Sequence, residues 1–293
     1  MAKMSEYAFV AAMLATALAI VLYLMYAVSG LRAARMQTAG GPGSGTVSLS
    51  SGPRTAAIGR YATILGWLAT LALLASLIFR TIATGHGPFA NMYEFSMAFA
   101  FGVLATYMWF EHKYHQRMLA LVALPVALLM MLYAATIPAD IEPLVPALQN
   151  NLLLTVHVAV AIVAYGSFAI AFAASLLYII QPSGGGWGLP KPQVLDEIGY
   201  RAVVVGFPFL TLTIVLGAVW ADTAWGTYWS WDPKETASLV TWFIYGAYLH
   251  ARVMRGWRGN RAAWLLVLGF AATLFTYFGN LFFGGLHSYS GLG

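Results

Sequence analysis

The feature that most limits what this chain can fold into is a succession of long apolar runs. A helix rises 1.5 Å per residue, so about 20 apolar residues are needed to cross roughly 30 Å of hydrocarbon. Eight runs fit this length, the seventh only when its flanks extend it. We therefore predict an all-α, polytopic membrane protein with about eight transmembrane helices, near residues 7–28, 61–82, 92–110, 118–135, 152–180, 202–221, 236–248 and 262–283.

Composition excludes a soluble globular domain. Hydrophobic residues fill 60% of the 293 positions and charged residues only 9%, whereas soluble domains carry about a quarter charged residues. The chain has no cysteine, which excludes disulfides, thiolate metal ligands and a thiol nucleophile within it. The first apolar run is too long for a signal-peptide core, and Arg32 and Arg35 follow it, so we interpret it as a retained span.

The distribution of lysine and arginine predicts the orientation, because cytoplasmic loops retain positive charge during insertion. The same rule accounts for the net charge of +5 without a nucleic-acid partner. Both termini and the tryptophan-rich connection before Lys234 are therefore expected on the extracytoplasmic side of a cell inner or plasma membrane. One set of alternate connections holds Arg32, Arg35, Arg54, Arg60, Lys113, Arg117, Lys191, Arg201, Arg252, Arg255, Arg258 and Arg261, and the other holds Lys3, Arg80 and Lys234.

Three regions are expected along the chain. Residues 1–36 form the first transmembrane helix. Residues 37–59, rich in Gly, Ser, Thr and Pro, form a flexible cytoplasmic linker with too little apolar surface to fold alone. Residues 60–293 form the main transmembrane domain, which includes an extracytoplasmic tryptophan-rich segment at residues 220–236. A second flexible connection is expected at residues 181–192.

The stretch W-G-T-Y-W-S-W-D-P-K-E, residues 225–235, joins the sixth and seventh apolar runs. Asp232 is placed to cap a helix that begins at Pro233, with Glu235 completing a capping box. The aromatic residues allow two interpretations: a belt at the membrane interface, or a continuous π surface for a flat ligand, favoured by their density. These residues are Trp220, Trp225, Tyr228, Trp229 and Trp231.

Three of the six histidines are candidate ligands. His157 lies about 8 Å into the fifth span, on the same side as the tryptophan-rich stretch, and His287 follows the eighth span on that side. Neutral imidazoles ligate haem iron, and two on opposite faces make a six-coordinate site. His250 lies about 27 Å beyond Asp232 along a continuous helix, at the cytoplasmic end, where no second ligand is evident. The remaining histidines are His86, which could line the external site, and His112 and His115, which are expected in a solvated cytoplasmic loop.

The tryptophan-rich stretch, followed by T-W-F-I-Y, resembles the signature of haem-handling membrane proteins. G-H-G-P-F-A-N-M-Y-E at residues 85–94 and G-L-H-S-Y near the end are also similar to that group. The resemblance covers most of the chain except the linker and points to the CcsA (ResC) family of system II cytochrome c synthase components, called CcsB in some bacteria. It implies that haem b is passed to the extracytoplasmic face and joined there to the C-x-x-C-H segment of apocytochrome c.

The resemblance also implies roles for single residues. His157 and His287 match two external histidines that ligate haem iron, and His250 matches a transmembrane histidine of an inner haem site. The other inner ligand belongs to a ResB-type (Ccs1) membrane partner, so this chain alone is expected not to complete thioether formation. Thiol-reducing proteins act indirectly, and no catalytic residue is assigned. The signature that cradles the haem is matched by Trp225, Trp229, Trp231 and Asp232.

Further assignments and alternatives stay open. Glu94 and Glu235 are candidates for ordering the site, and Lys234 for meeting a haem propionate. A CcmC-type handler of system I shares the signature and the outer histidine pair, although eight spans and His250 favour system II. A membrane b-type cytochrome acting on quinone would need histidines paired at matching depth. A transporter whose tryptophans are only interfacial is the third alternative.

Overall fold

The computed structural model describes residues 1–38, 52–141, 144, 148–149, 151–182, 188–279 and 282–287. Within these residues the chain forms α-helices and short 3-10 segments, and no β-strand, so the predicted all-α class is confirmed. The elements are α1 (Ala2–Thr38), α2 (Pro53–Thr84), α3 (Met92–Tyr114), η1 (Arg117–Leu119), α4 (Ala120–Ala134), α5 (Asn151–Ile180), α6 (Pro192–Trp225), α7 (Pro233–Met254) and α8 (Asn260–Phe278).

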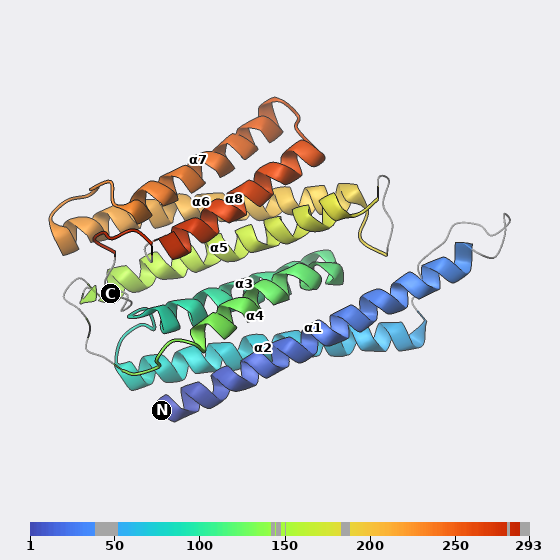
Figure 1. Cartoon of the computed structure of the whole chain (residues 1–293), viewed down its shortest axis with the longest axis horizontal. Helices are drawn as coiled ribbons and strands as arrows, with labels where there is room; N and C mark the ends of the chain where they lie inside the picture. Colours follow the sequence, from blue (N-terminus) through green and yellow to red (C-terminus); the bar gives the residue numbers. More distant parts are fainter. Residues whose placement is uncertain are drawn as a thin grey trace.

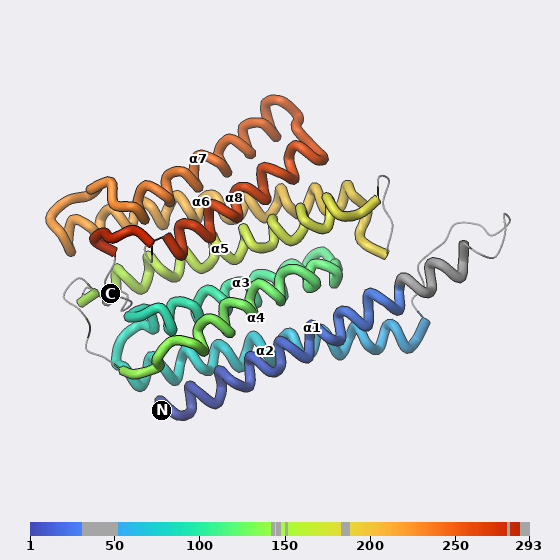
Figure 2. The backbone as a smooth tube through the Cα atoms, viewed as in Figure 1, coloured from blue at the N-terminus to red at the C-terminus, as the bar shows by residue number. Residues whose placement is uncertain are grey.

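The helices run side by side along the long axis of the molecule (Figure 1 and Figure 2). The hairpin of α1 and α2 forms one side of the bundle, α3 and α4 lie next to it, and α5 to α8 form the other side. α5 contacts α3, α4, α6 and α8, which makes it the central helix. The start of α1, the α6–α7 connection and residues 282–287 lie at the same end, which we call the tryptophan end.

Six helical segments are long and apolar enough to cross a membrane, and the protein is a multi-pass membrane protein. α3 and α7 have 23 and 22 residues, which is also sufficient length for a span, but their sequences are less apolar. The short seventh run at residues 236–248 is thus the middle of a helix that spans the bundle. The six segments are Ala2–Gly30, Pro53–Thr84, Arg117–Ala134, Leu152–Ile180, Pro192–Trp225 and Asn260–Phe278.

Helix extends into both ends of the linker predicted at residues 37–59. α1 continues through Thr38, and α2 begins at Pro53, because the fixed φ of proline suits the first turn of a helix. Residues 39–51 lie outside the described residues. The connection predicted at residues 181–192 lies between the end of α5 at Ile180 and the start of α6 at Pro192, with residues 183–187 outside the described part.

Small residues bring α3 and α5 into backbone contact. A Cβ added to Gly166 of α5 would lie only 2.5 Å from the carbonyl oxygen of Gly102 of α3, so neither position has room for a larger side chain. Membrane helices commonly pack through such small residues, because lipid gives them no hydrophobic drive to associate. The contact fixes the central helix, which carries His157, against α3.

Candidate functional site

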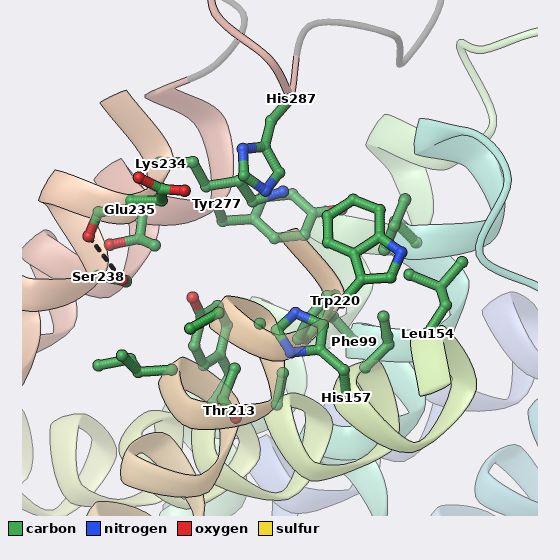
Figure 3. Close-up of a pocket in the computed structure, with 18 of the residues that line it drawn as sticks. Phe99, Leu154, His157, Thr213, Trp220, Lys234, Glu235, Ser238, Tyr277 and His287 are labelled. Atoms are coloured by element: carbon green, nitrogen blue, oxygen red, sulfur yellow. Dashed lines mark hydrogen bonds between the residues drawn. The ribbon is translucent and has the colours of Figure 1, made fainter. Parts of the chain in front are cut away.

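A pocket with about 930 Å³ of empty space, including space open to solvent, lies near the tryptophan end (Figure 3). Its walls come from α3, α5, α6, α7 and α8, together with the α6–α7 connection and the segment after α8. Most lining side chains are apolar or aromatic, and apart from tyrosines the ionisable ones are His157, Lys234, Glu235 and His287.

His157 faces this pocket from the second turn of α5. Its ring stacks on the indole of Trp220 from α6, with 6.4 Å between centroids and 18° between planes. The buried Nδ1 atom has no hydrogen-bond partner among the described residues. Since a buried polar atom without a partner costs free energy, an unpaired ring nitrogen inside a pocket is a candidate ligand atom.

His287 faces the same pocket from the segment after α8. Its Nδ1 lies 2.9 Å from Oδ1 of Asp232, the residue that precedes α7. A carboxylate at Nδ1 favours the tautomer that carries its proton there, which leaves the lone pair on Nε2 and is a common arrangement for metal-binding histidines. Figure 3 shows His287 and His157 on opposite sides of the pocket, with Trp220 beside them.

The charges of Asp232 and His287 follow from their contact. Burial by itself would raise the pKa of Asp232, but the hydrogen bond and charge of His287 and the N–H of Lys234 outweigh it and lower the pKa to about 2. Burial, together with the charge of Lys234, lowers the pKa of His287 more than Asp232 and Glu235 raise it. At neutral pH the pair is therefore a carboxylate and a neutral imidazole, which is the form that binds a metal.

The predicted cap at Asp232 is confirmed. The Asp232 carboxylate accepts from the N–H of Lys234, and the Glu235 side chain accepts from the N–H of Asp232, completing a capping box before α7. At the other side of the connection, Gly226 ends α6 in the left-handed region at φ 76°. Two anchored helix ends thus hold the α6–α7 connection, and with it the position of Asp232 beneath His287.

The tryptophans take different positions around the pocket. Trp229 lines it, and Trp225 packs edge-on against Trp220 and His287, with centroid distances of 4.7 and 4.9 Å. Trp231 is 69% exposed and outside the lining, and its φ of 59° is left-handed. Trp220 is 2% exposed and also lines the pocket, although it was not among the residues that the resemblance matched to the haem-cradling signature.

Sequence reasoning also missed the aromatic floor of the pocket. Phe99 of α3 stacks on Tyr165 of α5 at 5.0 Å and meets Tyr277 of α8 edge-on at 5.2 Å. The hydroxyl groups of Tyr277 and Ser96 are hydrogen-bonded at 2.7 Å. Three helices far apart in sequence therefore present one continuous aromatic surface in the wall of the pocket.

The other histidines lie away from this pocket. His250 is exposed near the end of α7, toward the end of the bundle opposite the tryptophan end. His86 is half-buried and its Nδ1 lies 2.8 Å from the carbonyl of Gly87. His112 and His115 are exposed where α3 ends. The two histidines that the structure brings together are thus His157 and His287.

Glu94 binds Arg80 outside the pocket lining. Both side chains are 1% exposed, with 2.8 Å between Nε and Oε1. Arg80 also donates to the carbonyls of Ala139 and Asp140, and Glu94 accepts from the N–H of Ala90. The pair therefore ties α2 and α3 to two connections at the tryptophan end.

Gly217 of α6 offers a direct test of the His157 position. A Cβ at residue 217 would lie 2.9 Å from Cε1 of His157, so the ring rests against the glycine. Gly217→Val should displace the imidazole of His157 and lower the affinity for any ligand that this ring binds, while the helix propensity of the position changes little. Gly246→Val, where a Cβ meets nothing nearer than 3.5 Å, is the matched control. Equal ligand affinity in the two variants, measured by titration, would contradict this assignment.

The fold and the pocket define a class: a polytopic helical membrane protein in which two histidines face one aromatic pocket at an end of the bundle. The chain belongs to the cytochrome c assembly protein family, whose model matches residues 89–287. The matched region contains α3 to α8 and both pocket histidines, so the family predicted from the tryptophan-rich stretch is confirmed.

Two relatives named cytochrome c biogenesis protein CcsA show the extent of the similarity. The one from Guillardia theta is 35% identical over 263 residues, covering 80% of this chain and 86% of the relative. The one from Prochlorococcus marinus (strain MIT 9312) is 37% identical over 258 residues, covering 77% and 83%. A solved structure named cytochrome c heme lyase CcmF shares the fold, with a TM-score of 0.59 and 21% identity. Its alignment covers 96% of this chain, which spans 50% of that chain.

Proposed function

We propose that this chain handles haem for cytochrome c maturation, binding haem b in the pocket at the tryptophan end and presenting it to apocytochrome c. The observation that carries the proposal is the pair His157 and His287, which face one pocket from α5 and from the segment after α8. Family membership supports it, since the relatives are named as cytochrome c biogenesis proteins.

The residues present fit haem. His157 has a buried Nδ1 without a partner among the described residues, and Asp232 holds His287 as a neutral imidazole with its proton on Nδ1. Two neutral imidazoles are a common axial pair for haem iron. Trp220, Trp229 and the aromatic floor supply flat apolar walls, which suit the faces of a macrocycle.

Attachment requires no redox change by this chain. Haem supplies two vinyl groups, and each thiol of C-x-x-C-H adds across one of them, so that a C–S bond forms and the thiol proton moves to the neighbouring carbon. His157 and His287 hold the substrate, the aromatic walls exclude water, and one imidazole yields its place to the histidine of C-x-x-C-H. Positioning supplies most of the rate in this account. Thiol-reducing proteins contribute indirectly, by keeping the two cysteines reduced.

We place the pocket on the extracytoplasmic side of an inner or plasma membrane. The support is the excess of Lys and Arg in the alternate set of connections. His250 is exposed on α7 toward the other end of the bundle, where a neighbouring membrane protein can reach it. We assign it to an inner haem site whose second ligand comes from a ResB-type (Ccs1) partner. A b-type cytochrome is disfavoured, since His157 and His250 lie toward opposite ends.

Reconstitution in cells tests this function. A host without its own maturation system should make covalently attached cytochrome c, detected as haem-stained protein on denaturing gels, only when this chain and its partner are produced together. The full complex purified from haem-replete cells should contain haem. A complex that is folded yet free of haem, and that matures no cytochrome c, would contradict the proposal.

Asp232→Asn should keep the cap of α7 but remove the carboxylate that sets the tautomer of His287. Asparagine caps helices about as well as aspartate, so the folded protein should be retained. Loss of the carboxylate should reduce haem affinity by at least about 10-fold, because partners of metal-binding histidines are typically worth 10- to 100-fold in metal affinity. Haem titration followed by absorbance measures this change. Asp140→Asn, at an exposed side chain, is the matched control, and equal affinity in both variants would refute the role of Asp232.

A further inference from the structure

Lys234 places a positive charge at the wall of the pocket. It is the second residue of α7 and lines the pocket together with His157 and His287. Figure 3 shows it close to His287, on the side of the pocket formed by α7. Its Nζ lies 5.6 Å from the ring centroid of Phe95, so its close environment includes an aromatic face.

No carboxylate of the described residues lies within ion-pair distance of this ammonium group. The two acidic residues closest to Lys234 in sequence form hydrogen bonds with other groups. Asp232 bonds to His287 and to the backbone N–H of Lys234, and Glu235 accepts from the N–H groups of Ser230 and Asp232. Other enclosed cations in the described part do have partners, as Arg80 pairs with Glu94 and Arg252 with Asp196.

A sheltered ammonium without an ion-pair partner is costly, because the nearby charge of Asp232 offsets only part of the hydration that Lys234 has lost. The cost is offset when a ligand brings a carboxylate into the pocket, since a hydrogen bond between an ammonium and a carboxylate is about twice as strong as a neutral one. The position of Lys234 therefore favours an anionic ligand over a neutral one of the same shape.

We infer that Lys234 binds a carboxylate of the porphyrin side chains and so makes the pocket selective for an acidic macrocycle, an inference that rests on haem being the ligand. The two acidic side chains of haem b occupy one edge of the ring and the two vinyl groups lie on the opposite half. A lysine at the start of α7 thus also orients the ring, with its acidic edge toward α7 and its vinyl groups away from that helix.

The test compares haem with its dimethyl ester, which has the same iron and vinyl groups but no carboxylates. The full-length chain should bind haem at least about 10-fold more tightly than the ester, the scale of one charged hydrogen bond. Lys234→Gln should bring the two affinities close together, mainly by weakening the binding of haem. Lys234→Arg should keep the preference for haem over the ester. Lys113→Gln is the matched control, because it makes the same change at an exposed residue where α3 ends.

The ratio of the two affinities separates recognition from a structural role. A variant that is merely damaged binds both porphyrins more weakly and leaves the ratio unchanged, and that outcome would overturn the inference while leaving haem binding intact. A wild-type chain that binds neither porphyrin would contradict the proposed function and this inference together.

Discussion

Replacing either His157 or His287 with glycine is expected to remove most of the bound haem and to stop cytochrome c maturation. Each imidazole is proposed as one of two iron ligands. Mutating even a residue that only hydrogen-bonds to a metal ligand typically lowers metal affinity by roughly 10- to 100-fold. Losing the ligand itself should therefore cost at least as much. The measurements are the haem absorbance of the purified complex and the yield of haem-stained cytochrome c.

His112→Gly is the matched control for these histidine variants, because His112 is exposed in the last turn of α3. Glycine also costs about 1 kcal/mol within a helix, so His157→Ala should be measured beside His157→Gly. Exogenous imidazole should restore part of the haem absorbance where the glycine leaves room for it. Haem content and maturation that persist in both single variants would reject the ligand assignment.

Arg80→Leu is expected to have the largest effect on stability. The change leaves the carboxylate of Glu94 buried without its cation and frees the carbonyls of Ala139 and Asp140. Removing one partner of a buried ion pair typically costs about 3–5 kcal/mol, a large share of the usual net stability of a protein. The folded fraction in detergent and its thermal midpoint, measured by size-exclusion chromatography after heating, should both fall.

Two further variants show whether the unpaired charge causes this loss. Arg60→Leu makes the same substitution at an exposed position on α2 and should leave the midpoint nearly unchanged. Arg80→Leu combined with Glu94→Gln should recover part of the stability, since no buried charge remains. A midpoint for Arg80→Leu equal to that of Arg60→Leu would show that the pair does not support the fold.

Much of the fold could be predicted because a membrane leaves the backbone few alternatives. Inside lipid each N–H and C=O must be bonded within the chain, so a long apolar run implies a helix. Helix ends were less predictable, as they depend on local backbone conformation. α6 runs past the predicted end at residue 221 to Trp225, where Gly226 takes a left-handed φ, and α8 ends at Phe278, before the predicted residue 283.

The cap at Asp232 and the end of the bundle that His157 and His287 share could be predicted from the sequence, but the contacts between distant residues of the site could not. The cap at Asp232 depends on residues within one turn, whereas its bond to His287 joins residues 55 positions apart. Trp220, Phe99 and Tyr277 meet through helix packing that no single segment encodes. One signal was available, because Thr213, Gly217 and Trp220 are spaced by four and three residues and so share a face of α6. That face lines the pocket.

The exposed position of Trp231 could not be predicted either. Its neighbours Trp225 and Trp229 lie near the pocket, but the left-handed φ of 59° at Trp231 breaks the regular course of the connection. The ring meets Trp229 edge-on at 5.8 Å and is otherwise largely exposed. Its proposed part in covering the haem therefore depends on how far it moves when the pocket is filled.

The central claim is that His157 and His287 together ligate haem iron in the pocket at the tryptophan end. The most direct measurement is the electron paramagnetic resonance spectrum of the full-length chain, purified without its partner and reconstituted with oxidised haem. Two axial imidazoles predict a low-spin, six-coordinate signal that is lost in both His157→Ala and His287→Ala, while any haem that stays bound becomes high-spin. A high-spin signal in the wild-type chain, or a low-spin signal that survives both single substitutions, would contradict the claim.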